Sequence, residues 1–129
     1  MPVLLDSTVL IDVLRGRPAA RRLLALRERG EVPYICAANT LEVHRGLRPD
    51  EVGRATAVLA AFQVAPLGAM EGALAGVWQR EFRARGVTLH EGDCLMAAAA
   101  VGVHATIVTG NPKDFPMEGV TVEHWPVGA

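Results

Sequence analysis

The sequence predicts a single α/β domain in which helices cover both faces of a central, mostly parallel sheet, giving a three-layer sandwich. The first observation behind this prediction is that short apolar runs alternate with longer segments of helical periodicity along the chain. The second observation is the length. A chain of 129 residues fits one compact core and has no room for a second, so we expect one domain over residues 1–129.

The first part of the chain predicts a strand followed by two helices. Val3–Leu5 is an apolar run that ends at Asp6, a residue type that commonly caps a helix. Apolar residues then recur at helical spacing until Gly16. A second helix is expected to begin at Pro18 and to end at Gly30, because proline favours helix starts and glycine favours helix ends.

The next part predicts a second strand and two more helices. Residues 32–37 (VPYICA) have the composition of a strand, and Pro33 is tolerated at its start. Asn39 is expected to cap the helix that follows, and Asp50 to cap another helix that continues to Phe62. The remaining expected elements are a strand at residues 63–65, helices at residues 69–85 and from Asp93, and strands at Thr106–Thr109 and residues 120–123.

The composition excludes several classes of protein. Half the residues are hydrophobic and 21% are charged, which is typical of a folded globular domain, and the net charge of −1 excludes a generally basic nucleic-acid binder. We find no signal-peptide pattern and no apolar run of the roughly 18 residues that a membrane helix needs. We therefore expect a cytoplasmic protein with no membrane partner. Cys36 and Cys94 are expected to be buried thiols, because they lack CxxC spacing.

Four carboxylates are expected at one edge of the predicted sheet. Asp6 directly follows the first strand, and Asp114 lies in the turn after Thr106–Thr109. Glu42 lies in the first turn of the helix after the second strand, and Asp93 lies at the start of the helix before Thr106–Thr109. Ligands of parallel α/β sheets bind beyond the carboxyl ends of the strands, often at helix N-termini. We therefore expect these four side chains to meet.

Grouped carboxylates of this kind favour a metal site. They repel one another unless a cation lies between them, and Mg²⁺ prefers carboxylate and water oxygens. Such a cation lowers the pKa of bound water and stabilises charge on a phosphodiester. Each acid also has an ordinary explanation. Asp6 and Asp93 suit helix starts, Asp114 suits a turn, and Glu42 fits a capping box with Asn39. Their joint placement at one edge favours the metal site.

Four segments resemble the motifs of the PIN-domain ribonucleases, in the order in which that family carries them. Together they span residues 4–115, so the resemblance covers nearly the whole chain. Each motif alone is weak, whereas four in order are specific. The segments are residues 4–12 (LLDSTVLID), 39–47 (NTLEVHRGL), 90–100 (HEGDCLMAAAA) and 107–115 (IVTGNPKDF).

The resemblance implies a PIN-like fold and a Mg²⁺- or Mn²⁺-dependent endoribonuclease that hydrolyses RNA phosphodiesters by metal-activated water. Carried over motif by motif, it makes Asp6, Glu42, Asp93 and Asp114 the catalytic, metal-binding site. Asp6 and Asp93 are then the most direct metal ligands. Glu42 and Asp114 bind through water or position the nucleophile.

The resemblance also implies supporting residues. Thr109 and Asn111 are expected to support the acids by hydrogen bonding. The family's opening motif often reads Asp-Thr-Asn, whereas this chain has Asp-Ser-Thr, so a hydroxyl of Ser7 or Thr8 is expected to replace the asparagine contact. His44 stands where the family more often has an aliphatic residue.

In its small size the chain resembles the VapC-type toxins of type II toxin–antitoxin pairs. This resemblance implies a homodimer that a cognate antitoxin inhibits, in a heterotetramer or a larger assembly. A tail of the antitoxin typically lies in an apolar groove near the acidic site, and the helices at residues 18–29 and 50–62 are candidates for that groove. Arg15, Arg17 and Lys113 flank the acidic motifs and are candidates for holding the RNA backbone.

Several other functions are alternatives to the ribonuclease. A non-catalytic α/β binding module, whose acids only stabilise helix starts, predicts no metal affinity. A phosphoacceptor domain needs two neighbouring acids early in the chain, and Asp6 and Asp12 are too far apart. A cysteine nucleophile at Cys94, paired with His90 four residues earlier, lacks a third residue to orient it. Cleavage of DNA stays open, because a metal site acting on a phosphodiester does not itself distinguish sugars.

Overall fold

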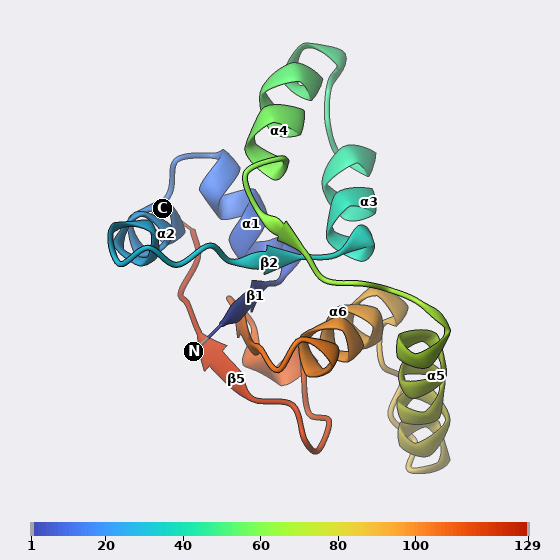
Figure 1. The fold of residues 1–129 in the computed structure, drawn as a ribbon. Helices are drawn as coiled ribbons and strands as arrows, with labels where there is room; N and C mark the ends of the chain where they lie inside the picture. The colour runs from blue at the N-terminus through green and yellow to red at the C-terminus, as the bar shows by residue number, and fades with distance from the viewer. Residues whose placement is uncertain (1, 129) are drawn as a thin grey trace.

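Five short strands form one sheet in which every neighbouring pair is parallel (Figure 1). The structure, a computed structural model, describes residues 2–128. The strand order is β3-β2-β1-β4-β5, so β1 lies at the centre of the sheet. The strands are β1 (Val3–Leu5), β2 (Tyr34–Ile35), β3 (Gln63–Val64), β4 (Thr106–Thr109) and β5 (Val122–His124).

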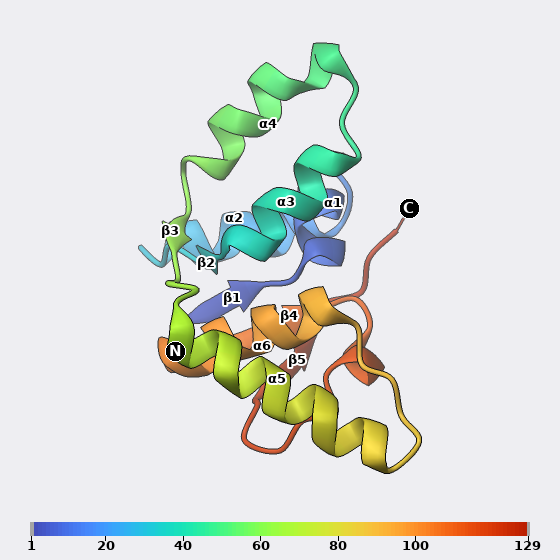
Figure 2. The same cartoon turned by 90° about the vertical axis from the view of Figure 1, so that its right-hand side faces the viewer.

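Helices cover both faces of this sheet, which confirms the predicted three-layer sandwich. One face carries α1 (Ser7–Leu14), α2 (Ala19–Glu28), α3 (Ala37–Arg45) and α4 (Val52–Leu59), and the other carries α5 (Ala69–Ala84) and α6 (Glu91–Gly102) (Figure 2). Two 3₁₀ turns complete the fold, η1 (Pro49–Glu51) and η2 (Pro112–Asp114). In the described range, residues 2–128, we find no helix with the length and apolar character needed to cross a membrane.

Neighbouring strand residues belong to two separate cores. Leu4 and Ile107 pack with α5 and α6, whereas Leu5 and Val108 pack with α1 to α4. All four side chains are fully buried. Successive residues of a strand point to opposite faces, so a sheet covered on both faces needs continuous apolar strands. This is why the apolar runs in the sequence identified β1 and β4.

The region around β2 corrects two predictions. The strand is shorter than residues 32–37, because Pro33 has no backbone N–H to donate and α3 already begins at Ala37. Asn39 does not cap α3. The N-cap is Cys36, and Asn39 is the third helical residue, with its side chain accepting the Cys36 N–H. The predicted capping box between Asn39 and Glu42 is therefore wrong, and Glu42 lies in the second turn of α3.

Two other boundaries also differ from prediction. Asp50 lies inside η1 and does not cap a helix that reaches Phe62, because α4 begins at Val52 and ends at Leu59. The backbone N–H of Arg48, the N-cap residue of η1, donates to the Glu51 carboxylate at 2.9 Å. The final strand is Val122–His124, two residues later than its predicted start.

Candidate active site

Asp6 lies where β1 ends and α1 begins, and its carboxylate is 2% exposed. One oxygen, Oδ1, accepts the Val9 backbone N–H at 3.0 Å and the Thr8 hydroxyl at 2.6 Å. The other oxygen, Oδ2, accepts the Thr109 hydroxyl from β4. Burial raises the pKa of Asp6, and the hydrogen bonds from Thr109, Thr8 and Val9 oppose this rise. A carboxylate has about four acceptor positions, so one position on Oδ2 is left for a further ligand.

Asp93 is the third residue of α6 and is half-buried. Burial raises the pKa of its carboxyl to about 6, and the negative charge of Asp114 adds to this rise. Glu42 and Asp6 raise the pKa further, whereas His90, whose Nδ1 lies 4.0 Å from Asp93 Oδ2, lowers it. The structure therefore brings the four predicted acids near enough for their charges to act on Asp93.

Glu42 reaches from α3 to the first turn of α6. A Cβ atom added at Gly92 would overlap Glu42 Oε2, so the missing side chain at Gly92 provides the space in which this carboxylate lies. Asp114 is half-buried in η2, directly after β4. The four acids thus lie at the junction of β1 and α1, in α3, in α6 and in η2, and the neighbouring strands β1 and β4 precede the first and the last.

The donor set fits a hard cation in its chemistry, because it consists of carboxylate oxygens on one edge of a sheet. It is not a closed coordination shell. Among residues 2–128, no group of three or more His, Cys, Asp or Glu side chains is arranged so that it could hold a metal ion.

Thr8 and Ser7, the two hydroxyl residues expected to support Asp6, make different contacts. Thr8 contacts Asp6 and also accepts the Gly110 N–H at 3.0 Å, so it links the start of α1 to the end of β4. Ser7 instead contacts Asn39 and Met96, with its Oγ 3.4 Å from Asn39 Nδ2 and 3.7 Å from Met96 Sδ. Asn111 meets the site through its backbone N–H, which donates to Thr109 Oγ1 at 2.9 Å, while its side chain is exposed.

Sequence reasoning missed two buried polar residues. Asn39 of α3 is fully buried, and its side chain contacts Leu5 of β1, Cys36 at the start of α3 and Met96 of α6. Asp12 is 3% exposed, and its carboxylate accepts the Ala19 N–H at 2.9 Å and the Gly128 N–H at 3.0 Å. Asp12 therefore joins the start of α2 to the C-terminal segment. No local pattern could indicate this role, because one partner lies 116 residues away.

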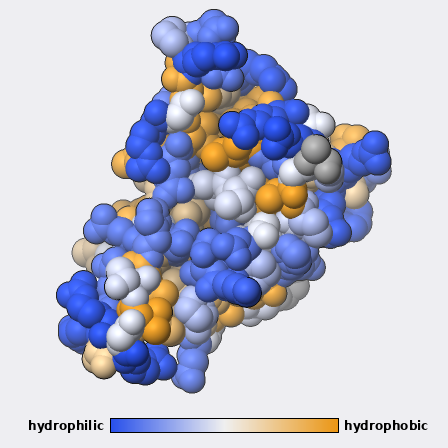
Figure 3. Space-filling model, turned by 180° about the vertical axis from the view of Figure 1, so that it is seen from behind, coloured by the Kyte–Doolittle hydropathy of each residue, from blue (hydrophilic) through white to orange (hydrophobic). Residues whose placement is uncertain are grey.

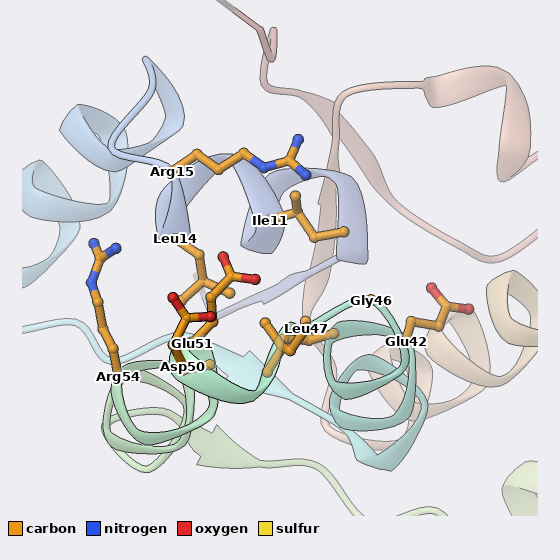
Figure 4. Close-up of a pocket in the computed structure, with 11 residues that line it drawn as sticks. Ile11, Leu14, Arg15, Glu42, Gly46, Leu47, Asp50, Glu51 and Arg54 are labelled. Carbon is orange, nitrogen blue, oxygen red and sulfur yellow. The ribbon is translucent and has the colours of Figure 1, made fainter.

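A cavity of about 240 Å³ opens beside Glu42, between α1, α3, η1 and α4. Ile11, Leu14 and Leu47 contribute apolar surface to its lining. Figure 3 shows hydrophobic surface in a hollow bounded by hydrophilic side chains on this side of the molecule. Figure 4 shows Glu42 and Arg54 at opposite ends of the cavity. The helix expected at residues 50–62 lines this cavity, but the helix expected at residues 18–29 does not. Residues of α2 instead line a separate cavity beside Trp125.

The remaining candidate residues differ in exposure. Arg15, Arg17 and Lys113 are exposed, and Arg15 lines the cavity that Glu42 also lines. Cys94 is fully buried, and burial raises the pKa of its thiol to about 11, with smaller contributions from Asp93 and Glu91. A buried, protonated thiol is a poor nucleophile, which excludes the cysteine mechanism.

Comparison with known proteins gives one consistent result. Residues 3–116 match the model of the PIN domain family. Ribonuclease VapC19 of Mycobacterium tuberculosis is 32% identical over 115 residues, covering 88% of this chain and 92% of the relative. Ribonuclease VapC10 of the same organism is 34% identical over 115 residues, covering 89% and 86%.

The solved structures agree on the fold. A chain in the structure of VapBC2 from Rickettsia felis, bound to a DNA fragment from its promoter, superposes with a TM-score of 0.83. The match covers 97% of this chain and 99% of that one at 19% sequence identity. At this level of identity the likeness shows that the two chains share a fold.

Proposed function

This chain belongs to the PIN domain family, and we propose that it is a divalent-metal-dependent endoribonuclease of the VapC type, the toxin of a toxin–antitoxin pair. The observation that carries the proposal is the raised pKa of the Asp93 carboxyl. Its pKa is raised to about 6 by burial and by the charges of Asp114, Glu42 and Asp6. A set of carboxylates that destabilise one another's charge is a functional-site arrangement, because nothing in folding requires it.

The proposed cofactor is Mg²⁺ or Mn²⁺. Asp6 and Asp93 would hold it directly, and Glu42 and Asp114 would hold it through water. When bound, the cation supplies the positive charge that activates water and offsets the charge of the phosphodiester. Its charge would also keep Asp93 ionised, because an adjacent positive charge favours the carboxylate over the acid.

The chain's own residues orient the acids. Thr109 and Thr8 donate hydrogen bonds to Asp6, which favours its charged form and fixes the plane of its carboxylate. The open space at Gly92 allows Glu42 to lie against the first turn of α6. A pKa of about 6 leaves Asp93 mostly ionised at neutral pH. The site can therefore bind a cation or hold a proton on an acid within the physiological range.

The proposed substrate is RNA, because the two relatives are named Ribonuclease VapC19 and Ribonuclease VapC10. Arg15, Arg17 and Lys113 are exposed and would contact its phosphates. Arg15 is the best placed of the three, because it and Glu42 line the same cavity.

The proposed protein partner is a cognate antitoxin, with the toxin acting as a homodimer within a heterotetramer or a larger assembly. The cavity between α1, α3 and α4 is the proposed place for an antitoxin segment. Its apolar lining suits one face of a helix, and Asp50, Glu51 and Arg54 along it would select charges on the segment. An occupant would also block the approach to Glu42.

Cleavage of labelled single-stranded and structured RNA by the purified protein tests the enzymatic proposal. We expect cleavage with Mg²⁺ or Mn²⁺, none with EDTA, and a loss of at least about a hundredfold in Asp93→Asn. Glu81→Gln, an exposed acid on α5, is the matched control and should keep full activity. Cleavage that persists in EDTA or in Asp93→Asn would overturn the metal site. Inactivity together with no Mn²⁺ binding would indicate a non-catalytic binding module.

A further inference from the structure

We propose that Asn39 is a positioning residue that fixes the relative placement of Asp6, Glu42 and Asp93. The proposal rests on the metal-dependent activity proposed above. Asn39 is fully buried at the start of α3, between β1 and α6. It belongs to neither the acidic set nor the hydrophobic core, and a buried amide of this kind is costly unless its polar atoms are all paired.

Every polar atom of the Asn39 side chain has a partner. Oδ1 accepts the Cys36 backbone N–H at 2.8 Å. Nδ2 donates to the Leu5 carbonyl at 3.0 Å, and it lies 3.1 Å from Met96 Sδ and 3.4 Å from Ser7 Oγ. The chemistry of these partners fixes the orientation of the amide, because the Cys36 N–H needs an acceptor and the Leu5 carbonyl needs a donor.

Each partner of Asn39 lies close in sequence to one of the acids. Leu5 immediately precedes Asp6 and Ser7 immediately follows it, so the amide contacts the chain on both sides of this carboxylate. Cys36 caps the helix that carries Glu42. One buried side chain therefore links the segments that hold these two acids.

The third link is to α6. Met96 lies three residues after Asp93 on this helix, and its sulfur contacts both Asn39 Nδ2 and Ser7 Oγ. Three elements that are far apart in the sequence thus meet at a single amide. No other amino acid combines an acceptor and two donors in this shape, so replacement by alanine removes all three links at once.

This arrangement matters for metal binding because Mg²⁺ and Mn²⁺ ligands must be placed accurately. Octahedral Mg²⁺ sites hold their oxygens at about 2.0–2.1 Å, and hydrogen-bonded residues behind metal ligands typically change affinity or activity by about 10- to 100-fold when replaced. Loss of Asn39 removes none of the four acids. It removes the contacts that hold the acids in their relative positions.

The test measures Mn²⁺ affinity by calorimetry and cleavage kinetics in Asn39→Ala. We expect Mn²⁺ affinity and kcat to fall by about 10- to 100-fold, while KM for RNA changes by less than about threefold. Leu59→Ala, a buried residue of α4 away from the acids, is the matched control for lost stability. At a temperature where both variants are folded, Leu59→Ala should keep wild-type Mn²⁺ affinity and kcat.

Two results would overturn the role of Asn39: wild-type Mn²⁺ affinity and kcat in folded Asn39→Ala, or equal losses in Leu59→Ala. If Asn39→Ala does not fold, Asn39→Ser decides the question. Its hydroxyl can still accept the Cys36 N–H at the helix start but is too short to reach the Leu5 carbonyl, so the same losses are expected. Failure of the wild-type protein itself to bind Mn²⁺ and cleave RNA would instead overturn the proposed function.

Discussion

Residues 15–29 and the acidic edge around Asp6 differ in both charge and exposure. Residues 15–29 contain six of the thirteen basic side chains and one of the fourteen acidic ones, a net charge of +5 against −6 for the rest of the chain. All six arginines are exposed, and two of them stack on aromatic rings, Arg22 over Trp125 and Arg27 over Phe62. At the acidic edge, Asp6 is buried, and Glu42, Asp93 and Asp114 are half-buried.

The acidic edge and residues 15–29 therefore use charge in different ways, because one set of charges is buried or half-buried and the other is exposed. Buried charges interact strongly over short distances because water does not screen them, so their effect depends on atomic placement. Exposed charges are each worth little and are screened by salt, but together they attract a polyanion over a longer range. We therefore expect substitutions at the acidic edge to act on catalysis and on pH dependence. Substitutions among residues 15–29 should act on RNA affinity and its dependence on salt.

Adding one methyl group at the acidic edge is expected to reduce cleavage strongly. In Gly92→Ala the new Cβ overlaps Glu42 Oε2, so the carboxylate must move away from α6. A displacement of about 1 Å in a catalytic constellation costs on the order of a hundredfold, and we expect kcat to fall by about 10- to 100-fold. Steady-state cleavage assays would measure the loss.

The control for this change is the same substitution in another helix. Gly76 lies in α5, and a Cβ there meets no atom within 4 Å. Gly76→Ala should keep full activity and stabilise the protein by about 0.5–1 kcal/mol, because alanine favours a helix more than glycine does. Equal activity in the two variants would show that the position of Glu42 does not matter for cleavage.

The next effect concerns stability and pH in the absence of metal. The folded state raises the pKa of Asp93 from 3.8 to about 6, so between these values the folded state binds more protons than the unfolded state. The free energy of unfolding should therefore fall as pH rises through this window. Asp93→Asn removes the titrating group, so the variant should lose less stability than the wild type between pH 4 and pH 7.

Urea unfolding in EDTA at several pH values would measure this difference. Asp6, whose pKa is also raised, should leave some pH dependence in Asp93→Asn. At pH 7 the variant should be the more stable protein, because it no longer holds a charge that burial and Asp114 oppose. Parallel stability curves for the two proteins would contradict the raised pKa.

The sequence predicted the sheet and the placement of the acids for one physical reason. A parallel strand buried on both faces must be mainly apolar, so β1 and the centre of β4 were visible as apolar runs, with Asp6 and Asp114 in the segments that follow them. Residues that directly follow such strands lie at the same edge of the sheet, whatever the conformation of the loops that connect them to the helices. The relative placement of Asp6 and Asp114 therefore followed from the pattern alone.

The role of Asn39 could not be predicted in the same way. Asn-x-x-Glu fits a capping box that starts at residue 39, and the local pattern does not reveal that α3 begins at Ala37 with Cys36 as its cap. The contacts that decide the matter involve Leu5 and Met96, which are 34 and 57 residues away. The role of Gly92 could not be predicted from the local pattern either, since the space beside it is occupied by a carboxylate from another helix.

The smallest effect is expected from the arginines. Arg15→Ala/Arg17→Ala should weaken RNA binding by about three- to tenfold and lower the slope of log K against log salt by about 1.4, since each contact with a single-stranded phosphate contributes about 0.7. Binding would be measured by fluorescence anisotropy in Asp93→Asn, which prevents cleavage. Arg80→Ala/Arg83→Ala on α5 removes the same charge from another exposed surface and is the matched control. Equal losses in the two double variants would mean that only net charge matters, whereas a loss confined to the first would place the RNA across the C-terminal end of α1.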